Sequence, residues 1–290
     1  MYYLGRFNFD SDNFLRAAAA LQEAYNQTPP KFERHRRLIL TYLIPSNIML
    51  GPFPTAMLFS RPEAQTLGPI FGPVIAAVQD GNFLKFQEAL SNHGDWLYRK
   101  GILLTFTYRL RPLLWRTFTR KVFMITYDPP EGQNSRAAAT LNLADVVTAA
   151  AYIQKRLEGY VKANPAHRSR PPHINTLFMK AVSNNVADAD STLVPPPGGP
   201  KKLRPSEGLF WGNLPASIKE VEGVVANLIA QGLMHGFLAH SSGRFAVMGA
   251  KQKGPIIAGW PTITQVILDR MQEEGVDLES VPGWVKEQQF

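Results

Sequence analysis

The sequence offers few residues whose types and spacing could support catalysis. His235 and His240 are five residues apart, on either side of Gly236 and next to a Ser-Ser-Gly turn. In an extended strand, side chains an odd number of residues apart point to opposite faces, so these imidazoles would not converge on one metal ion. Zinc requires three or four ligands, and neither a cysteine nor a well-placed acid supplies them. We therefore interpret His235 as a surface or helix-end residue and expect no metal or cofactor.

Motifs for nucleophiles and for phosphate binding are also absent. There is no Gly-x-Ser-x-Gly elbow and no Gly-x-x-x-x-Gly-Lys-Ser/Thr loop. The stretch "PPPGGPKK" has glycines near lysines, but its prolines interrupt the succession of backbone N–H donors that a phosphate loop needs. The stretch "DSDNF" lacks the later glycine and glutamate of a calcium loop, so helix capping is the better interpretation. We expect a protein that is not an enzyme.

The basic residues are more informative. The formal net charge is +8 and the isoelectric point is about 9.7, so a polyanionic partner competes with a merely solvated basic surface. Three clusters of cations surround one small predicted domain, and phosphate contacts from such residues are sequence-independent and salt-sensitive. The candidate nucleic-acid-binding residues are Arg116, Arg120 and Lys121 on a helix, Lys201, Lys202 and Arg204 in a flexible insertion, and Arg244, Lys251 and Lys253 on and after a hairpin.

A second set of charges is expected to meet protein partners. The candidate partner-binding residues are Arg34, Arg36, Arg37, Glu220 and Glu222. The three arginines could form a basic groove for a small acidic protein, and the alternative is internal pairing with glutamates such as Glu23 and Glu63. The two glutamates are a poor surface to insert into a major groove lined by phosphates, so their helix is not expected to read DNA sequence. They could equally meet a basic patch on a partner.

The N-terminal part of the chain predicts consecutive helices. In "DSDNFLRAAAALQEAYNQ", apolar residues recur at the spacing of one helix face, with Ser11 or Asp12 as the cap. "FERHRRLILTYLIPSNIML" predicts a second helix, with Leu38 among its core residues, and more helices follow to about residue 110. This alternation is that of an α-α solenoid, which we assign to residues 1–108. Because the first residues are typical of the middle of a helix, we expect a chain cut from a longer protein.

The rest of the chain predicts a winged helix over residues 109–255. Three helices are predicted at "RPLLWRTFTRKVFMIT", at "LNLADVVTAAAYIQKRL" with Asn142 or Asp145 as its cap, and at "SIKEVEGVVANLIAQ" with Gly232 as its stop. "LMHGFLAH" and "RFAVMGA" then predict a hairpin. Helix, helix, helix, hairpin is the order of a winged helix, so the predicted fold class is mainly α: a helical-repeat solenoid followed by a winged helix with a small β-hairpin.

Prolines interrupt this domain between its second and third helices. "RSRPPH" and "VPPPGGPKKLRP" cannot sustain a helix or a ladder, so we predict a long irregular insertion at about 159–217, with one short helix at "INTLFMKAVSNN". Residues 256–290 are predicted to hold one more helix, with Thr262 and Gln265 in a capping box and Gly275 as the stop. No apolar run approaches the ~18–20 residues of a membrane span. The absence of cysteine fits a reducing compartment.

Several segments, in fixed order, resemble a known family. They are "RRLILTYLIPSNIMLGPFPT", "GNFLKFQEALSNH", "LYRKGILLTF", "LLWRTFTRKVF" and "EVEGVVANLIAQGLMHGFLAHSSGRFAVM". Helical repeats that end in a winged helix are the layout of the PCI domain. These segments resemble those of the PCI subunit of the transcription-and-export complex 2, which links mRNA production to nuclear pores. The same segments occur in a paralogous group, the signalosome-associated twelfth-subunit family. The resemblance covers roughly residues 1–157 and 218–250, so nothing is carried onto the insertion.

The resemblance implies a non-enzymatic adaptor. It implies that the winged helix pairs with that of a larger PCI scaffold subunit, and that a small acidic proteasome-lid protein braces the pair. It also implies binding of RNA and DNA without sequence preference, a role in mRNA export, and a location in the nucleus that includes the periphery of the nuclear pore. Two alternatives stay open: a signalosome- or splicing-associated PCI paralogue, and a structural scaffold whose basic charge attracts only acidic protein.

Overall fold

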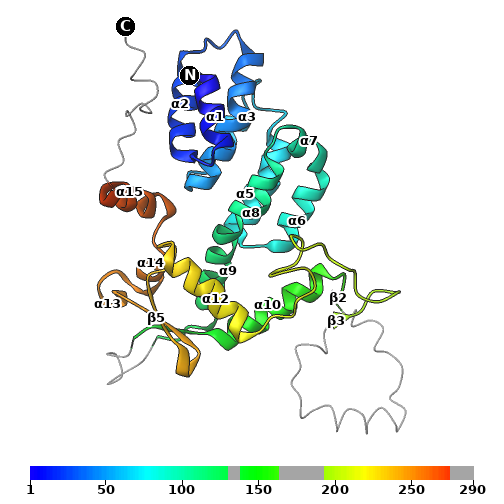
Figure 1. Ribbon diagram of the computed structural model, residues 1–290, viewed down its shortest axis with the longest axis vertical. Helices are drawn as coiled ribbons and strands as arrows, with labels where there is room; N and C mark the ends of the chain where they lie inside the picture. Colours follow the sequence, from blue (N-terminus) through cyan, green and yellow to red (C-terminus); the bar gives the residue numbers. More distant parts are fainter. Residues whose placement is uncertain (130–137, 163–192, 275–290) are drawn as a thin grey trace.

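The computed structural model describes residues 1–129, 138–162 and 193–274. The helix predicted at "INTLFMKAVSNN" and the stop predicted at Gly275 lie outside the described residues. Helices dominate, with a small three-stranded sheet near the C-terminal end, and the predicted fold class is confirmed. Figure 1 shows a helical layer in blue and cyan above a second layer that contains the sheet.

The helical layer consists of successive helices that pack on their neighbours, as the sequence predicts. Its elements are α1 (Tyr2–Asp10), α2 (Phe14–Gln27), α3 (Glu33–Leu50), α4 (Ala56–Phe59), α5 (Gly68–Asp80), α6 (Phe83–Asn92), α7 (Gly94–Arg99) and α8 (Leu103–Arg109). The cap of α2 differs from the prediction, because the Asn13 side chain accepts the Arg16 N–H. Asp12 adopts a φ of 60° in the turn and pairs instead with Arg109.

The second layer has the element order of a winged helix. Its elements are α9 (Arg111–Thr126), β1 (Thr140–Asn142), α10 (Leu143–Leu157), α12 (Ile218–Ala230), β4 (Gly236–Ala239) and β5 (Arg244–Val247). The sheet is antiparallel in the order β1-β5-β4, which puts Phe245 between Leu141 and Leu238. Strand β1 was not predicted, because three residues are too few to show a hydrophobic alternation. Asn142 caps α10 and Ser217 caps α12.

One continuous hydrophobic core joins the two layers. The α5 helix packs on α9, and Phe83 at the start of α6 makes edge contacts with Trp115 and Phe118 of α9. Gly81, which ends α5 with a φ of 60°, lies so close to α9 that a Cβ there would be 2.7 Å from the Phe118 nitrogen. The winged-helix elements are therefore fixed against the helical layer through α9.

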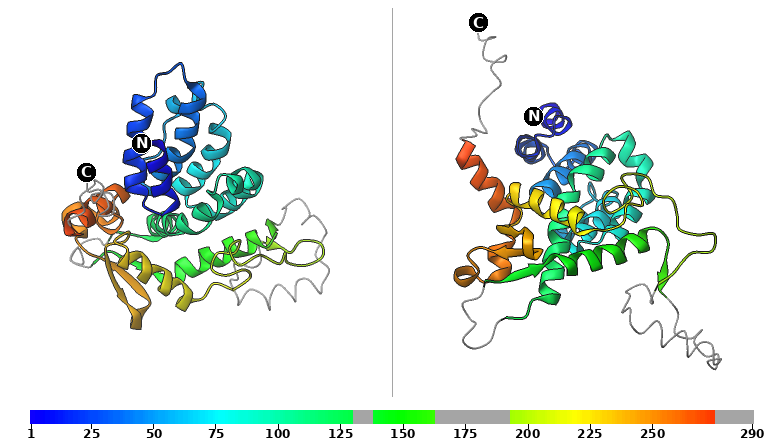
Figure 2. Two further views of the ribbon diagram at one scale, coloured as in Figure 1. Left: turned by 45° about the horizontal axis from the view of Figure 1, so that its top comes forward. Right: turned by 60° about the horizontal axis from the view of Figure 1, so that its bottom comes forward.

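Two further segments complete the second layer. Strand β2 (Val161–Lys162) pairs with β3 (Leu193–Val194) at the base of the predicted insertion, and α10 and α12 lie side by side in both views of Figure 2. After β5 come α13 (Ala250–Lys253), α14 (Pro255–Gly259) and α15 (Ile263–Glu274). The predicted capping box is confirmed only in part: the Thr262 hydroxyl accepts the Gln265 N–H, but the Gln265 side chain donates to Asp269. Among the described residues, none of the helices combines the length and apolar character that crossing a bilayer would take.

Candidate nucleic-acid and partner interface

The hairpin of β4 and β5 and the following α13, residues 236–253, which we call the wing, carry three of the residues predicted to contact phosphate. Arg244 begins β5, directly after a turn that ends at Gly243 with a φ of 59°. Lys251 and Lys253 lie in α13, beyond the other end of the strand. All three residues are exposed, and within 1–129, 138–162 and 193–274 none of them forms an ion pair. A four-residue strand spans about 13 Å, so the cations line the length of the wing rather than one point on it.

Arg116 has a structural role that the sequence did not predict. Its Nη2 donates to the carbonyl oxygens of Trp260 and Pro261, at 3.1 and 2.6 Å, and its Nε is buried without a partner. Burial lowers the pKa of Arg116 to about 10, and the nearby charge of Arg120 contributes in the same direction. The guanidinium therefore fastens the segment after α14 to α9, an internal role that competes with the predicted contact to phosphate.

The two other predicted residues of α9 remain nearer the surface. Lys121 lies 3.4 Å from the carboxylate of Asp80, which also pairs with Lys85. A hydrogen bond from Lys85, followed by the charge of Lys121, lowers the pKa of Asp80. Exposed pairs of this kind contribute little stability, so Lys121 can exchange Asp80 for a phosphate at small cost. Arg120 is half-buried four residues after Arg116.

The third cluster lies on a loop whose backbone is hydrogen-bonded to α10. Lys201, Lys202 and Arg204 are exposed, as predicted, but residues 199–214 are bonded to the body of the domain. The Lys201 N–H donates to the Glu158 carbonyl, and the Asn213 side chain bonds to the backbone of both Lys201 and Leu203. The described part of the insertion is irregular as predicted, and these hydrogen bonds hold its backbone.

Two of the three arginines expected to bind a partner pair inside the protein. Arg36 lies 3.1 Å from the carboxylate of Glu63 and its guanidinium stacks 4.1 Å from the centre of the Tyr25 ring. The Arg37 Nε donates to the Glu63 carbonyl oxygen at 3.3 Å. Internal pairing with a glutamate, the alternative interpretation, is therefore confirmed for Arg36, whereas Arg37 reaches only the backbone carbonyl of Glu63. Arg34 is exposed.

The buried Glu63 carboxylate is the centre of this cluster. The Tyr25 hydroxyl donates to it at 2.8 Å, and Arg61 donates to the same hydroxyl at 2.9 Å. Burial alone would raise the pKa of Glu63, but a backbone hydrogen bond, Tyr25 and the two arginine charges together lower it. The Tyr25 pKa is raised, first by burial and then by its bond to Glu63. The cluster joins α2 to α3.

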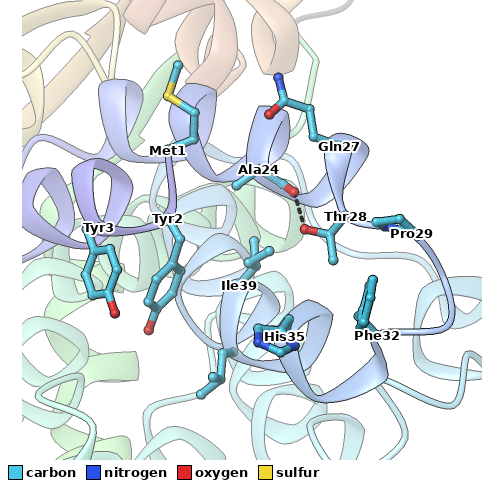
Figure 3. Close-up of a pocket in the computed structure, with 11 residues that line it drawn as sticks. Met1, Tyr2, Tyr3, Ala24, Gln27, Thr28, Pro29, Phe32, His35 and Ile39 are labelled. Atoms are coloured by element: carbon cyan, nitrogen blue, oxygen red, sulfur yellow. Dashed lines mark hydrogen bonds between the residues drawn. The ribbon is translucent and has the colours of Figure 1, made fainter.

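An apolar groove of about 740 Å³ lies beside this end of the helical layer. Figure 3 shows its lining, in which Tyr2 and Tyr3 of α1 face Phe32, His35 and Ile39 on the other side. Leu38 also lines it and is 44% exposed, so its predicted place in the core is wrong: it lies on the outer edge of α3. The titratable side chains of the lining are Tyr2, Tyr3 and His35.

One acidic residue of α12 contacts the turn between β4 and β5. Glu222 lies 2.5 Å from Nδ1 of His240 in the turn between β4 and β5. Its carboxylate is therefore engaged within the domain, whereas the sequence predicts that it contacts a partner. Glu220 is half-buried in the first turn of α12. His235 is exposed, and its backbone bonds to Gly259 and Met248. In the part of the chain that the structure describes, no three potential metal ligands gather.

Two exposed aromatic side chains were missed by the sequence reasoning. Phe237 on the edge strand β4 is 55% exposed, and Trp211 in the ordered loop is 68% exposed. The available signal for Trp211 was a large aromatic residue between Gly208 and Gly212, close to a run of cations. For Phe237 the signal was an aromatic residue in a short strand directly before a turn.

Comparison with known proteins identifies the group to which the chain is related. No family model matches the sequence. A segment of 129 residues, 44% of this chain, is 33% identical to a PCI domain-containing protein of Schizosaccharomyces pombe and covers 28% of it. A segment of 125 residues, 43% of this chain, is 34% identical to PCI domain-containing protein 2 of Xenopus laevis and covers 30% of it.

A longer and weaker match reaches through most of the chain. Enhanced ethylene response protein 5 of Arabidopsis thaliana is 23% identical over 90% of this chain, which corresponds to 46% of that protein. The matches therefore span less than half of each relative's length. Together with the helical layer and the winged-helix element order, they show that the chain is similar to PCI-domain proteins, and the relatives matched at 32–34% identity include PCI domain-containing protein 2.

Proposed function

We propose that this PCI-domain scaffold has no enzymatic activity and binds RNA and DNA without sequence preference. The observation that carries the proposal is the wing, where Arg244, Lys251 and Lys253 are exposed along about 13 Å of surface. Cations that form no ion pair within the described residues keep their full charge for phosphates. Contacts to phosphate fix position without reading sequence.

The third helix of the winged helix supports binding without sequence preference. Asn227 and Lys219 of α12 are exposed, and its two glutamates, Glu220 and Glu222, are each half-buried. Glu222 is close to His240, so a carboxylate lies where α12 meets the wing. A negative charge at that place opposes insertion of α12 into a major groove lined by phosphates. The wing then grips the backbone of the nucleic acid while α12 stays outside the groove.

The proposal includes a larger PCI subunit that pairs with this winged helix. Strand β4 is an edge of the sheet, because among the described residues it pairs with β5 alone. Phe237 on β4, Met248 after β5 and Ile257 on α14 are exposed by 55%, 47% and 68%. An edge strand with exposed apolar side chains is a surface suited to a protein partner. Arg34, still exposed beside the apolar groove, is the remaining candidate contact for a small acidic proteasome-lid protein.

The cellular role that follows is nuclear mRNA export, in a complex that couples transcription to the nuclear pore. A composite of two PCI subunits would combine their basic surfaces, and such a surface suits transcripts of any sequence. Isolation of the native complex, with identification of the larger PCI subunit, tests this role. Recovery of signalosome or splicing subunits in place of export subunits would assign the chain to the paralogous group.

Charge reversal on the wing tests nucleic-acid binding. We expect the triple variant Arg244→Glu, Lys251→Glu, Lys253→Glu to bind a labelled RNA of arbitrary sequence at least about tenfold more weakly at low salt. The matched control reverses three exposed cations of the helical layer, Lys31→Glu, Arg34→Glu, Arg99→Glu, with the same change in net charge. Equal losses in the two variants would mean that only net charge matters, and the proposed wing contact would be wrong.

The alternative function is a scaffold that binds protein only. The exposed apolar side chains beside β4 favour it, because they suit a protein partner and contribute nothing to phosphate binding. The same experiment separates the two functions. A protein-only scaffold would bind RNA weakly in every variant, and the wing variant would lose affinity only for an acidic protein partner.

A further inference from the structure

The loop of residues 199–214 presents a large aromatic side chain to solvent from a rigid support. Trp211 is 68% exposed, whereas its neighbour Phe210 packs inward with its ring centre 5.2 Å from that of Trp115. Leu203 and Leu209 of the same loop are buried. The loop therefore has an inner side that packs on the domain, and Trp211, its largest side chain, lies on the opposite, solvent-facing side.

Buried polar groups hold this loop in place. Arg111, whose pKa burial lowers, donates to the carbonyl oxygens of Ser206, Gly208 and Leu209. The buried Gln154 side chain accepts from the Leu209 N–H at 2.9 Å and donates to the Gly212 carbonyl at 2.9 Å. These bonds fix the backbone on both sides of Trp211, because Leu209 and Gly212 flank it.

The turn around Trp211 is also sterically tight. A Cβ at Gly208 would lie 1.8 Å from the Gly212 carbonyl oxygen, and Gly212 itself has a φ of 56°. Only glycine fits the first position, and glycine is favoured at the second. A side chain held out on such a turn loses little conformational freedom on binding, which raises the affinity that it can contribute.

Three cations lie on the segment of the loop that runs beside Gly212 and Asn213. The Gly212 N–H donates to the Pro205 carbonyl, and Asn213 bonds to Lys201 and Leu203, so residues 201–205 run beside residues 212 and 213. Lys201, Lys202 and Arg204 project from this stretch and are exposed. Glu207 lies 4.0 Å from the Arg204 Nε and balances part of its charge, which leaves the loop a net positive charge.

From this arrangement we infer a site for a single-stranded nucleic acid, in which a base stacks on Trp211 and the adjacent phosphates contact Lys201, Lys202 and Arg204. An aromatic platform next to cations is the combination that binds unpaired bases without sequence preference. A paired duplex hides the faces of its bases and offers only phosphates to this loop. The inference rests on the proposed function and adds that single strands are preferred at this end of the domain.

The helix α10 connects this loop to the wing. Asn142, before α10, pairs with Arg244 in the sheet, and Gln154 and Glu158 at the other end of the helix bond to the loop. A helix of fifteen residues is about 22 Å long. A single strand of nucleic acid that contacts both ends would therefore run along α10. The wing would contact its phosphates, and Trp211 would stack on one of its bases.

The test uses two probes with the same number of phosphates: a single-stranded oligonucleotide of mixed sequence, and one with abasic sites in place of its bases. Trp211→Leu keeps an apolar side chain but removes the ring. We expect it to weaken binding of the normal strand about tenfold and binding of the abasic strand by less than about twofold. Trp211→Phe keeps an aromatic ring and should retain most of the wild-type affinity for the normal strand. The control Tyr98→Leu removes an exposed ring from the helical layer and changes neither affinity.

Separate outcomes distinguish the stacking site at Trp211 from the proposed binding of nucleic acid by the wing. If Trp211→Leu leaves the affinity for the normal strand unchanged while the wing triple variant lowers it, the stacking site is wrong and the proposed function stands. If neither variant lowers the affinity, both are wrong. A loss of equal size for the two probes would show that Trp211 supports the loop rather than a base. Loss of a protein partner with unchanged RNA binding would assign Trp211 to a protein interface and overturn the inference.

Discussion

The guanidinium of Arg116 in α9 donates a hydrogen bond to the carbonyl oxygen of Pro261, with an Nη2–O distance of 2.6 Å. The same nitrogen reaches the Trp260 carbonyl, and the Trp260 indole donates to the Thr119 hydroxyl at 3.2 Å. A helix near the middle of the chain thus holds the segment that leads into α15. One arginine of the basic set therefore stabilises the fold, while those on the wing remain available for binding.

Arg116→Ala should destabilise the protein by about 2–3 kcal/mol, because two carbonyl oxygens lose a charged donor. Urea unfolding measures this change. The control Arg120→Ala removes a cation one turn later, and we expect a change within about 0.5 kcal/mol. The RNA affinity of the folded Arg116→Ala protein should match that of the wild type. An Arg116→Ala protein with normal stability and weakened RNA binding would show that Arg116 contacts phosphate and does not stabilise the fold.

Glu63→Gln should cost about 3 kcal/mol at pH 7, because Arg36 would keep a charge with little exposure and no carboxylate partner. The pKa of Glu63 is lowered in the folded protein from its ordinary value of 4.5, so its contribution is present above that value and is lost as the pH falls through the folded pKa. The difference between wild type and variant should therefore shrink below about pH 4.5.

Urea titrations at several pH values between 7 and 3 measure this difference. The control Glu23→Gln removes an exposed carboxylate of α2 that accepts only from Gln27 within the described residues, and it should change stability little at any pH. A Glu63→Gln protein whose deficit stayed constant down to pH 3 would show that the charge of Glu63 is not what stabilises this cluster.

Gly81→Ala should destabilise the junction between the two layers by about 2–3 kcal/mol. The residue has a φ of 60°, and a Cβ there would meet the α9 backbone at 2.7 Å. Gly223→Ala is the matched control, because Gly223 lies inside α12 with nothing within 4 Å of a Cβ. That change should stabilise the protein by about 0.5–1 kcal/mol. Thermal unfolding of the two variants measures both effects, and similar shifts would contradict the account of this junction.

Hydrophobic periodicity was enough to predict the longer helices and the hairpin, but not the short helices α13 and α14 or the break between α7 and α8. The face of α12 marked by Val221, Val225 and Leu228 is buried, and the hairpin turn falls at the Ser-Ser-Gly sequence. Strand β1 was missed because its three residues pair with β5, about a hundred residues later, and such pairing leaves no local pattern. The order of the described part of the insertion comes from Arg111 and Gln154, which lie outside it.

The positions of the charged side chains were harder to predict. Arg116 and Arg36 have the spacing of surface cations, but each meets a partner brought near by the tertiary fold: Pro261 for the first and Glu63 for the second. Sequence spacing shows which residues share a helix face and does not show what covers that face. The wing residue Arg244 was placed correctly because a tight hairpin turn exposes its neighbours whatever the rest of the fold does.

Removing the acidic charges of α12 should strengthen nucleic-acid binding. We expect Glu220→Gln with Glu222→Gln to raise affinity for RNA about two- to fivefold at low salt, because less negative charge then opposes phosphates at the wing. Glu23→Gln with Glu88→Gln makes the same change in net charge on the helical layer and should have a smaller effect. Fluorescence anisotropy measures both variants. Equal gains would assign the effect to net charge, and no gain in the first variant would place α12 away from the nucleic acid.

The salt dependence of duplex DNA binding tests the central claim most directly. The logarithm of the association constant is measured against the logarithm of the salt concentration for the wild type and for the wing variant Arg244→Glu, Lys251→Glu, Lys253→Glu. Each phosphate contact contributes about 0.9 to the slope, so loss of three contacts should make the slope shallower by about 2.7. Parallel lines for the two proteins would show that the wing does not contact phosphate and would contradict the account.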